Sequence, residues 1–137
     1  MAQEYPAIHS WQASNENRQV LDIREKPLFT GVMIHHTMIV AFDDPIPADV
    51  LDQYLKELEE LVTGSGVVES FAARHHIRVP GDDHSPVAVA SAVVQLRLAD
   101  LDALNATFTM PGAVDLIRRW QGRCPYKAIW VNHEPLS

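Results

Sequence analysis

The chain has 137 residues, and its 18 acidic side chains outnumber its 11 lysines and arginines to give a formal net charge of -7. This length suits one domain, and the charge argues against nucleic acid or an anionic membrane surface as a partner, because both need clustered basic residues. Cys124 is the only cysteine, so no internal disulfide can form. No apolar run approaches the roughly 20 residues that span a bilayer. We therefore expect a cytoplasmic protein with no membrane partner.

Residues 1–31 differ in composition from the rest and are predicted to form an N-terminal arm ahead of a domain over residues 32–137. A polar stretch at residues 14–18 separates apolar side chains that include Trp11, Leu21 and Ile23. These are too many for a freely solvated tail. We expect the arm to dock on the domain or on a partner subunit.

The first half of the domain predicts a strand, a helix and a second strand. Residues 32–42 are apolar and β-branched, which is typical of a strand covered on both faces. A helix is predicted to start at Pro47, with apolar residues at helical spacing, and to end at Gly64. Residues 67–79 alternate between two faces and predict the second strand.

The second half continues with a hairpin, helical segments and a last strand. A turn over residues 80–86 leads into a strand over residues 87–98. Asp100 or Asp102 is predicted to cap a short helix that runs through Phe108, and Pro111 to lie in the first turn of a helix that ends at Trp120. Residues 126–134 form the final strand.

The order β-α-β-β-α-β indicates an α+β protein with a ferredoxin-like fold and an antiparallel sheet. The helices can cover only one face of this sheet. We expect Ile39, Ala41, Val93 and Trp130 on the other face, where they would leave an apolar surface larger than a monomer usually exposes. A homodimer formed through this open face is therefore predicted.

The sequence IHHTMIVAF at residues 34–42, the helix from Pro47 and the sequence GVVESF at residues 66–71 resemble the stress-responsive dimeric α/β-barrel family, often called Dabb. The resemblance covers residues 33–134. Its most recognisable part is a histidine at the start of strand one, matched by His36 before Met38, Val40 and Phe42. The family includes plant polyketide cyclases, hydroxynitrile lyases and many stress-associated proteins without an assigned reaction, so the resemblance implies a dimeric α/β barrel but does not decide the activity.

In the cyclases of that family, two histidines act in a pocket between the sheet and the helices. His36 matches the first histidine. The second falls at Met110, before Pro111, and a further family histidine falls near Ala92. A thioether cannot transfer protons, so the cyclase mechanism cannot be carried over intact.

Two other histidines are candidates to replace the missing group. If strand one is antiparallel to the last strand and parallel to strand three, the start of strand one meets the ends of the last and second strands. His36, His133 and His75 would then share one pocket, where imidazoles can take and give protons in enolisation, aldol closure or lyase chemistry. The alternative is that each histidine is a packed strand residue bonded to a neighbouring backbone group.

Three classes of function remain open. The first is a cofactor-independent cyclase, lyase or isomerase acting by histidine acid/base catalysis on an apolar, carbonyl-containing or polyketide-like substrate. The second is a non-catalytic stress-response or small-ligand-binding dimer, and the third is a haem- or metal-binding relative. We expect no metal, because adjacent histidines in a strand send their rings to opposite faces. The predicted substrate-binding residues are Met38, Val40, Phe42, Tyr54, Leu58, Phe71, Val94, Met110 and Trp120.

Overall fold

The computed structural model describes residues 33–137. The predicted N-terminal arm lies outside the described residues, so its docking stays a prediction. Within residues 33–137, no helix has both the length and the apolar character needed to cross a membrane.

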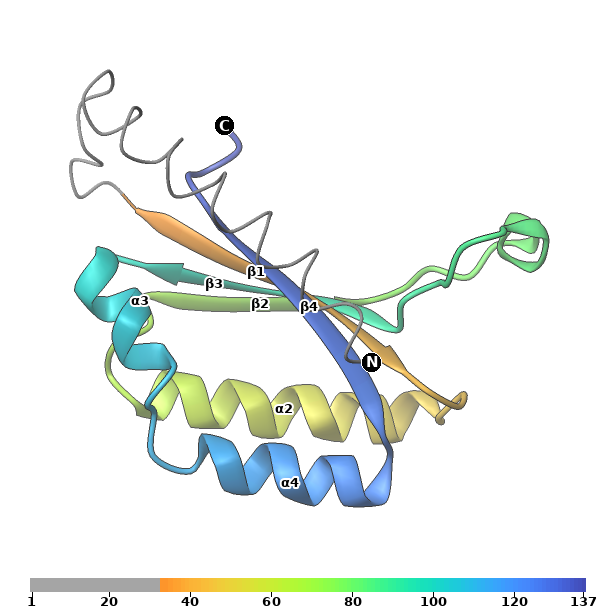
Figure 1. Ribbon diagram of the computed structural model, residues 1–137, viewed down its shortest axis with the longest axis horizontal. Helices are drawn as coiled ribbons and strands as arrows, with labels where there is room; N and C mark the ends of the chain where they lie inside the picture. Colours follow the sequence, from red (N-terminus) through yellow and green to blue (C-terminus); the bar gives the residue numbers. More distant parts are fainter. Residues whose placement is uncertain (1–32) are drawn as a thin grey trace, which may run out of the picture. The chain divides into compact units, whose positions relative to one another are not determined.

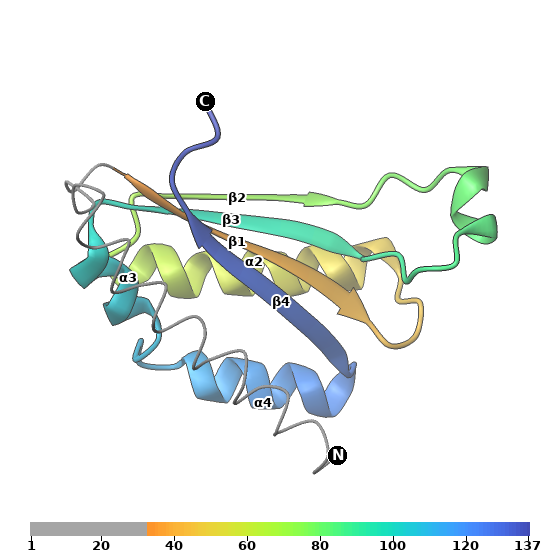
Figure 2. The same cartoon turned by 45° about the horizontal axis from the view of Figure 1, so that its top comes forward.

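Four strands form one antiparallel sheet, and the helices lie on one side of it (Figures 1 and 2). The strands run in the order β2-β3-β1-β4 across the sheet. The chain order of strands and helices is the predicted βαββαβ order, with a second helix split into two segments. The elements are β1 (Ile34–Phe42), α2 (Ala48–Gly64), β2 (Ser70–His75), η1 (Pro80–His84), β3 (Ala92–Leu98), α3 (Leu101–Thr107), α4 (Ala113–Arg123) and β4 (Tyr126–His133).

Local chemistry sets the helix boundaries. The carbonyl of Pro47 accepts hydrogen bonds from the amides of Val50 and Leu51 in α2, and the Asp100 carboxylate caps α3 by accepting from the Ala103 amide at 2.8 Å. The start of α4 differs from the prediction. Gly112 adopts a φ of +89°, which is left-handed and non-helical, so α4 begins at Ala113 and not at Pro111.

The direction of β3 corrects one prediction. It runs antiparallel to β1, with Ile34 opposite Leu98, and not parallel. The crossover through α2 makes β2 parallel to β1, and the hairpin then reverses the chain into β3. As a result, the start of β1 meets the ends of β3 and β4, whereas the end of β2 lies at the other end of the sheet.

The register assigns each side chain to a face. Val40, Val94 and Leu98 lie on the helix side, where they are at most 1% exposed and form the core with the aromatic rings of Tyr54 and Trp120. The other face carries an exposed apolar group, here called the open-face cluster. Its members are Ile39, Val93, Ile129 and Val131.

Trp130 was predicted to lie on this open face, and that prediction was wrong. It stands opposite Met38 in the ladder between β1 and β4, so its side chain is on the helix side. Ile129 and Val131 take the open-face positions on β4. The open face therefore remains apolar, as predicted, but with different residues on β4.

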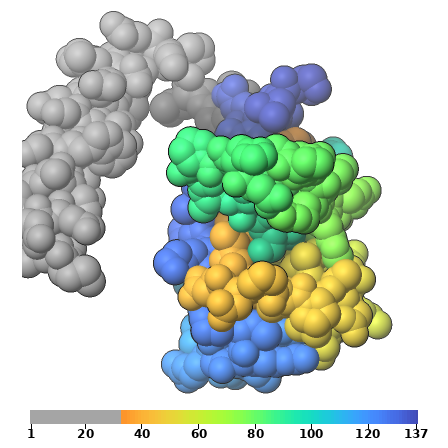
Figure 3. All heavy atoms as spheres, turned by 90° about the vertical axis from the view of Figure 1, so that its right-hand side faces the viewer, coloured from red at the N-terminus to blue at the C-terminus, as the bar shows by residue number. Residues whose placement is uncertain are grey.

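Residues 76–91 connect β2 and β3 and project beyond the end of the sheet, where Figure 3 views their tip end-on. The sheet pairing of this hairpin is shorter than predicted, since β2 ends at His75 and β3 begins at Ala92. Asp82 holds the turn together by binding the His76 Nε2 at 2.7 Å and accepting from the Val79 amide at 3.0 Å. These hydrogen bonds lower the pKa of the Asp82 carboxyl.

Candidate active site at His36

His36 is the third residue of β1 and faces the helices. Its neighbours across the ladder are Leu96 on β3 and Asn132 on β4. Only 8% of the residue is exposed, which makes it the one polar or charged residue among the buried residues of the described chain. A buried imidazole needs a polar partner, because an unpaired polar group costs free energy in an apolar environment.

Asn132 supplies this partner. The Nδ1 of His36 lies 2.7 Å from the Oδ1 of Asn132. A carboxamide oxygen only accepts hydrogen bonds, so in this arrangement Nδ1 carries the proton. In the neutral ring, Nε2 is then the nitrogen with a free lone pair, and it can accept a proton.

Two aromatic rings contact the imidazole. The ring of Phe108 meets it edge-on, and the ring of Trp130 is tilted against it, each with a centroid distance of 5.8 Å. Phe108 and Trp130 also contact one another at 5.8 Å. The three rings bring together β1, β4 and the end of α3.

A pocket of about 240 Å³ opens beside His36, between the sheet and the helices, and it is here called the His36 pocket. Its walls are almost entirely apolar. Phe108, Val114, Ile117 and Trp130 are each about half exposed and also line the pocket, so they form its mouth. Among the described residues, His36 and Thr107 are the polar side chains of the lining.

Four of the nine predicted substrate-binding residues line this pocket: Met38, Leu58, Val94 and Met110. The other five do not line it. Val40, Tyr54 and Trp120 are at most 1% exposed and belong to the core. Phe42 packs against the rings of Tyr54 and Tyr126, and Phe71 lines a separate hollow next to α2.

Tyr54 and Trp120 are core residues, and the polar atom of each side chain has a hydrogen-bond partner. Burial and the hydrogen bond to Tyr126 raise the pKa of the Tyr54 phenol, which keeps it protonated. The indole N–H of Trp120 donates to Glu57 at 2.8 Å, and Arg119 donates to the same carboxylate oxygen at 2.7 Å. These bonds join α4 to α2 and lower the pKa of Glu57.

His75 does not join His36, contrary to the prediction. It faces the helix side, but it lies opposite Ala92, and Ala92 lies opposite Val40. This places it at the far end of the sheet. Its Nε2 lies 2.6 Å from the Asp52 carboxylate on α2, so this contact links β2 to α2.

His133 lies on the open face, so its predicted place in the pocket was also wrong. It stands opposite His35, whose ring it meets edge-on at 5.6 Å. Its Nδ1 donates to the carbonyl of Glu134 at 2.7 Å, which leaves its Nε2 to accept from the Thr37 hydroxyl at 2.7 Å. This histidine is hydrogen-bonded to its surroundings, as the alternative interpretation expected.

The site therefore contains one histidine, oriented by an asparagine that the sequence reasoning missed. Asn132 adjoins His133, and its place opposite His36 becomes visible only from the register of β1 and β4. Met110, which the sequence resemblance places where the cyclases have their second histidine, lines the pocket. Within residues 33–137, no three His, Cys, Asp or Glu side chains are grouped so that they could hold a metal ion.

Comparison with known proteins supports the fold. No family model matches the sequence, and no curated protein matches it. Solved structures do match. A Dabb family protein with a ferredoxin-like fold from Mesorhizobium loti aligns with a TM-score of 0.57 and 20% identity over 77% of this chain and 98% of that one.

Two further structures are informative about the range of proteins with this fold. The hydroxynitrile lyase from Passiflora edulis has a TM-score of 0.60 at 10% identity, covering 78% of this chain and 97% of that one. A dimeric ferredoxin-like protein of unknown function from Thermobifida fusca has a TM-score of 0.59 at 14% identity, covering 80% and 97%. The predicted ferredoxin-like fold is confirmed, as is the structural resemblance to Dabb proteins; at these identities the comparison shows the fold and not the activity.

Proposed function

We propose that the His36 pocket binds a small, apolar carbonyl compound and that His36 is the acid/base group of a cofactor-independent lyase or isomerase. The observation that carries this proposal is the hydrogen bond between His36 and Asn132. It fixes one tautomer of a buried imidazole and leaves the basic nitrogen free beside an apolar pocket. A core histidine with only a packing role would not require such a pocket.

The chemistry follows from the position of the proton. Nε2 removes a proton from a carbon next to the carbonyl, and the ring becomes an imidazolium. Asn132 stabilises that cation, because its oxygen accepts from Nδ1–H. The imidazolium can exchange its proton with water, and His36 then delivers a proton to a leaving group or back to carbon.

A single proton-transfer group favours some reactions over others. Lyase and isomerase steps can be completed with one group that first takes a proton and then gives one back. The cyclase mechanism of the resembling family uses two histidines, and Met110 cannot act as the second. The lyase from Passiflora edulis shows that this fold supports lyase chemistry in another protein, which favours the lyase alternative here.

The replacement of a histidine by Met110 also supports the second candidate, a protein that binds small apolar molecules without turnover. The two candidates predict the same pocket but different chemistry. Deuterium exchange separates them. A simple methyl ketone such as 2-pentanone is incubated with the protein in D₂O, and loss of the signal from the protons next to the carbonyl is followed by NMR.

Exchange above the buffer rate is expected for the wild type. His36→Ala should lower the protein-dependent rate by about 10²- to 10⁴-fold, the usual contribution of a positioned acid/base group. His75→Ala is the matched control, because its ring is bonded to Asp52 at the other end of the sheet. Ketone binding without exchange in the wild type would instead support the ligand-binding candidate.

We further propose that the chain forms a homodimer through its open sheet face. The open-face cluster is contiguous, because Ile39 lies opposite both Val93 and Ile129 in the two ladders. Ile129 is 71% exposed, and a second sheet packed on this face would bury such side chains. The Thermobifida fusca neighbour with the same fold is dimeric, which supports this proposal.

A further inference from the structure

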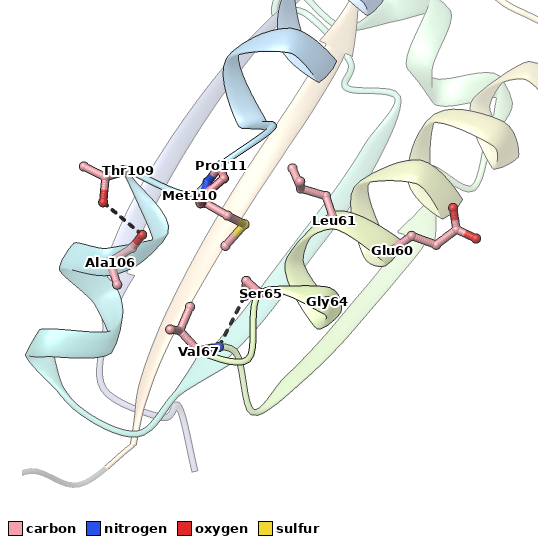
Figure 4. Close-up of a pocket in the computed structure, with 9 residues that line it drawn as sticks. All are labelled: Glu60, Leu61, Gly64, Ser65, Val67, Ala106, Thr109, Met110 and Pro111. Atoms are coloured by element: carbon pink, nitrogen blue, oxygen red, sulfur yellow. Dashed lines mark hydrogen bonds between the residues drawn. The ribbon is translucent and has the colours of Figure 1, made fainter.

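Two hollows share a wall made of two side chains. The first is the His36 pocket. The second, of about 590 Å³, lies between the C-terminal end of α2 and the connection from α3 to α4 (Figure 4). Among the described residues that line them, Leu61 and Met110 are common to both. These two side chains therefore separate the hollows.

We call Leu61 and Met110 the partition between the two hollows. Leu61 is closely approached by the backbone of the α3–α4 connection, whereas Met110 has a flexible side chain. In Figure 4 the Met110 side chain projects from the α3–α4 connection toward the end of α2, where Leu61 lies. Gly112 brings the connection so close that a Cβ at this residue would lie 3.1 Å from the Leu61 Cδ1. Met110 itself is only 7% exposed, yet its unbranched side chain has three rotatable bonds and adapts its shape readily.

The sizes of the two hollows indicate that the partition limits the length of a ligand in the His36 pocket. Pockets that bind drug-sized ligands usually measure about 300 to 1,000 Å³, and the His36 pocket, at about 240 Å³, is smaller than this range. It holds a short ligand. A longer chain that enters at the mouth near Trp130 must meet the Met110 and Leu61 wall or pass between them.

From this geometry we infer that Met110 sets the maximum length of the ligand, and that the ligands of this pocket are unbranched aliphatic carbonyl compounds whose chains point toward Met110. The inference rests on the proposed function for the choice of a carbonyl ligand. Removing the Met110 side chain joins the two hollows, so that longer chains continue into the second one, past Ser65 and Thr109. Met110 acts on ligand selection and not on proton transfer.

The test is a binding series with straight-chain methyl ketones, from 2-pentanone to 2-dodecanone, titrated by calorimetry. In the wild type, affinity should rise about fourfold for each added methylene, the gain expected from burying one such group, and then stop rising at a length limit. Met110→Ala should move this limit by at least two methylenes. A wild type without a limit, or a limit that Met110→Ala leaves unchanged, overturns the inference.

Met38→Ala is the matched control. It shortens a side chain of the same type in the His36 pocket, but Met38 does not line the second hollow, so it should move the length limit by less than Met110→Ala does. If thermal melting shows that Met110→Ala does not fold, Leu61→Ala opens the same partition from α2 and must move the limit in its place. Failure of Leu61→Ala to do so then overturns the inference.

The two proposals fail in different ways. A length limit that depends on Met110, found without deuterium exchange, contradicts only the proposed catalysis. Suppose instead that deuterium exchange depends on His36 but the ligand length limit is the same in the wild type and in Met110→Ala. This result contradicts only the role of the partition. Each result is read from a separate measurement with its own set of variants.

Discussion

The Nδ1 of His36 and the Oδ1 of Asn132 lie 2.7 Å apart, on two residues that stand directly opposite one another in the ladder between β1 and β4. The bond therefore links two regular strands and depends on no loop. A site supported by strands in this way holds its geometry better than one carried by loops. The orientation of the imidazole follows from the register of the sheet.

Substitution of Asn132 should separate orientation from stability. Asn132→Ala removes the acceptor for Nδ1–H, so we expect deuterium exchange to fall about 10- to 100-fold, mainly in kcat, while ketone affinity changes little. Asn132→Asp keeps an acceptor and adds a negative charge that favours imidazolium, which should shift the pH profile of exchange upward. A purely structural role predicts equal loss in both variants and no shift of the profile.

The proposed dimer can be tested at the open-face cluster. The wild type should sediment at twice the 15.3 kDa chain mass at micromolar concentration. Ile129→Asp places an unpaired carboxylate in the proposed interface and should produce monomers. Leu101→Asp is the control, because Leu101 is 52% exposed at the start of α3, away from the open face. A wild-type monomer, or a dimer that survives Ile129→Asp, would contradict the proposed interface.

Glu57 predicts a dependence of stability on pH. Its pKa is lowered below 4.5, first by the hydrogen bond from Arg119 and then by that from Trp120. A lowered folded-state pKa stabilises the protein above the unfolded-state pKa, and this stabilisation is lost as the pH falls through the folded-state value. Glu57→Gln keeps an acceptor for Trp120 but loses the charge, so it should cost about 1 kcal/mol at pH 7 and less than that at pH 3.

Urea denaturation at both pH values measures this difference. Glu59→Gln on the exposed side of α2 provides the comparison, and we expect it to change the free energy of unfolding by less than about 0.5 kcal/mol. A Glu57→Gln cost that is the same at pH 7 and pH 3 would show that the ion pair is not the cause.

Two glycines with positive φ allow a matched test of the close approach between Gly112 and Leu61. Gly66, at +81°, has open space around its missing side chain, whereas Gly112, at +89°, faces the Leu61 Cδ1. Alanine at either position pays for the left-handed backbone, about 1 to 2 kcal/mol. Gly112→Ala should lose more stability in denaturation than Gly66→Ala, because it also displaces Leu61. Equal losses would show that the contact has no energetic weight.

Alternation within strands predicted part of the site. In β1 it placed His36 and Met38 on one face, and both line the pocket. In β4 it separated two sets of residues but could not show which set faces the helices, since both Trp130 and Val131 are apolar. The predictions for Trp130 and His133 failed for this reason.

The remaining differences have other physical causes. The direction of β3 was predictable from the connectivity, because a crossover followed by a hairpin reverses the chain relative to β1. The partnership of His36 and Asn132 was not, since it joins residues 96 positions apart and depends on the register of two strands that are not adjacent in sequence. Most of the pocket's mouth comes from α4 and the end of α3. Tertiary packing decides which face of each helix is turned toward the sheet, so these mouth residues could not be identified from the sequence.

The adjacent residues His35 and His36 point to opposite faces of the sheet, one beside His133 and the other beside the pocket. This dipeptide therefore carries two independent spectroscopic reporters. In an NMR titration, the ring signals of His36 should respond to a ketone, and those of His35 should respond to protein concentration as subunits associate. One isotopically labelled amino acid would follow both surfaces in a single sample.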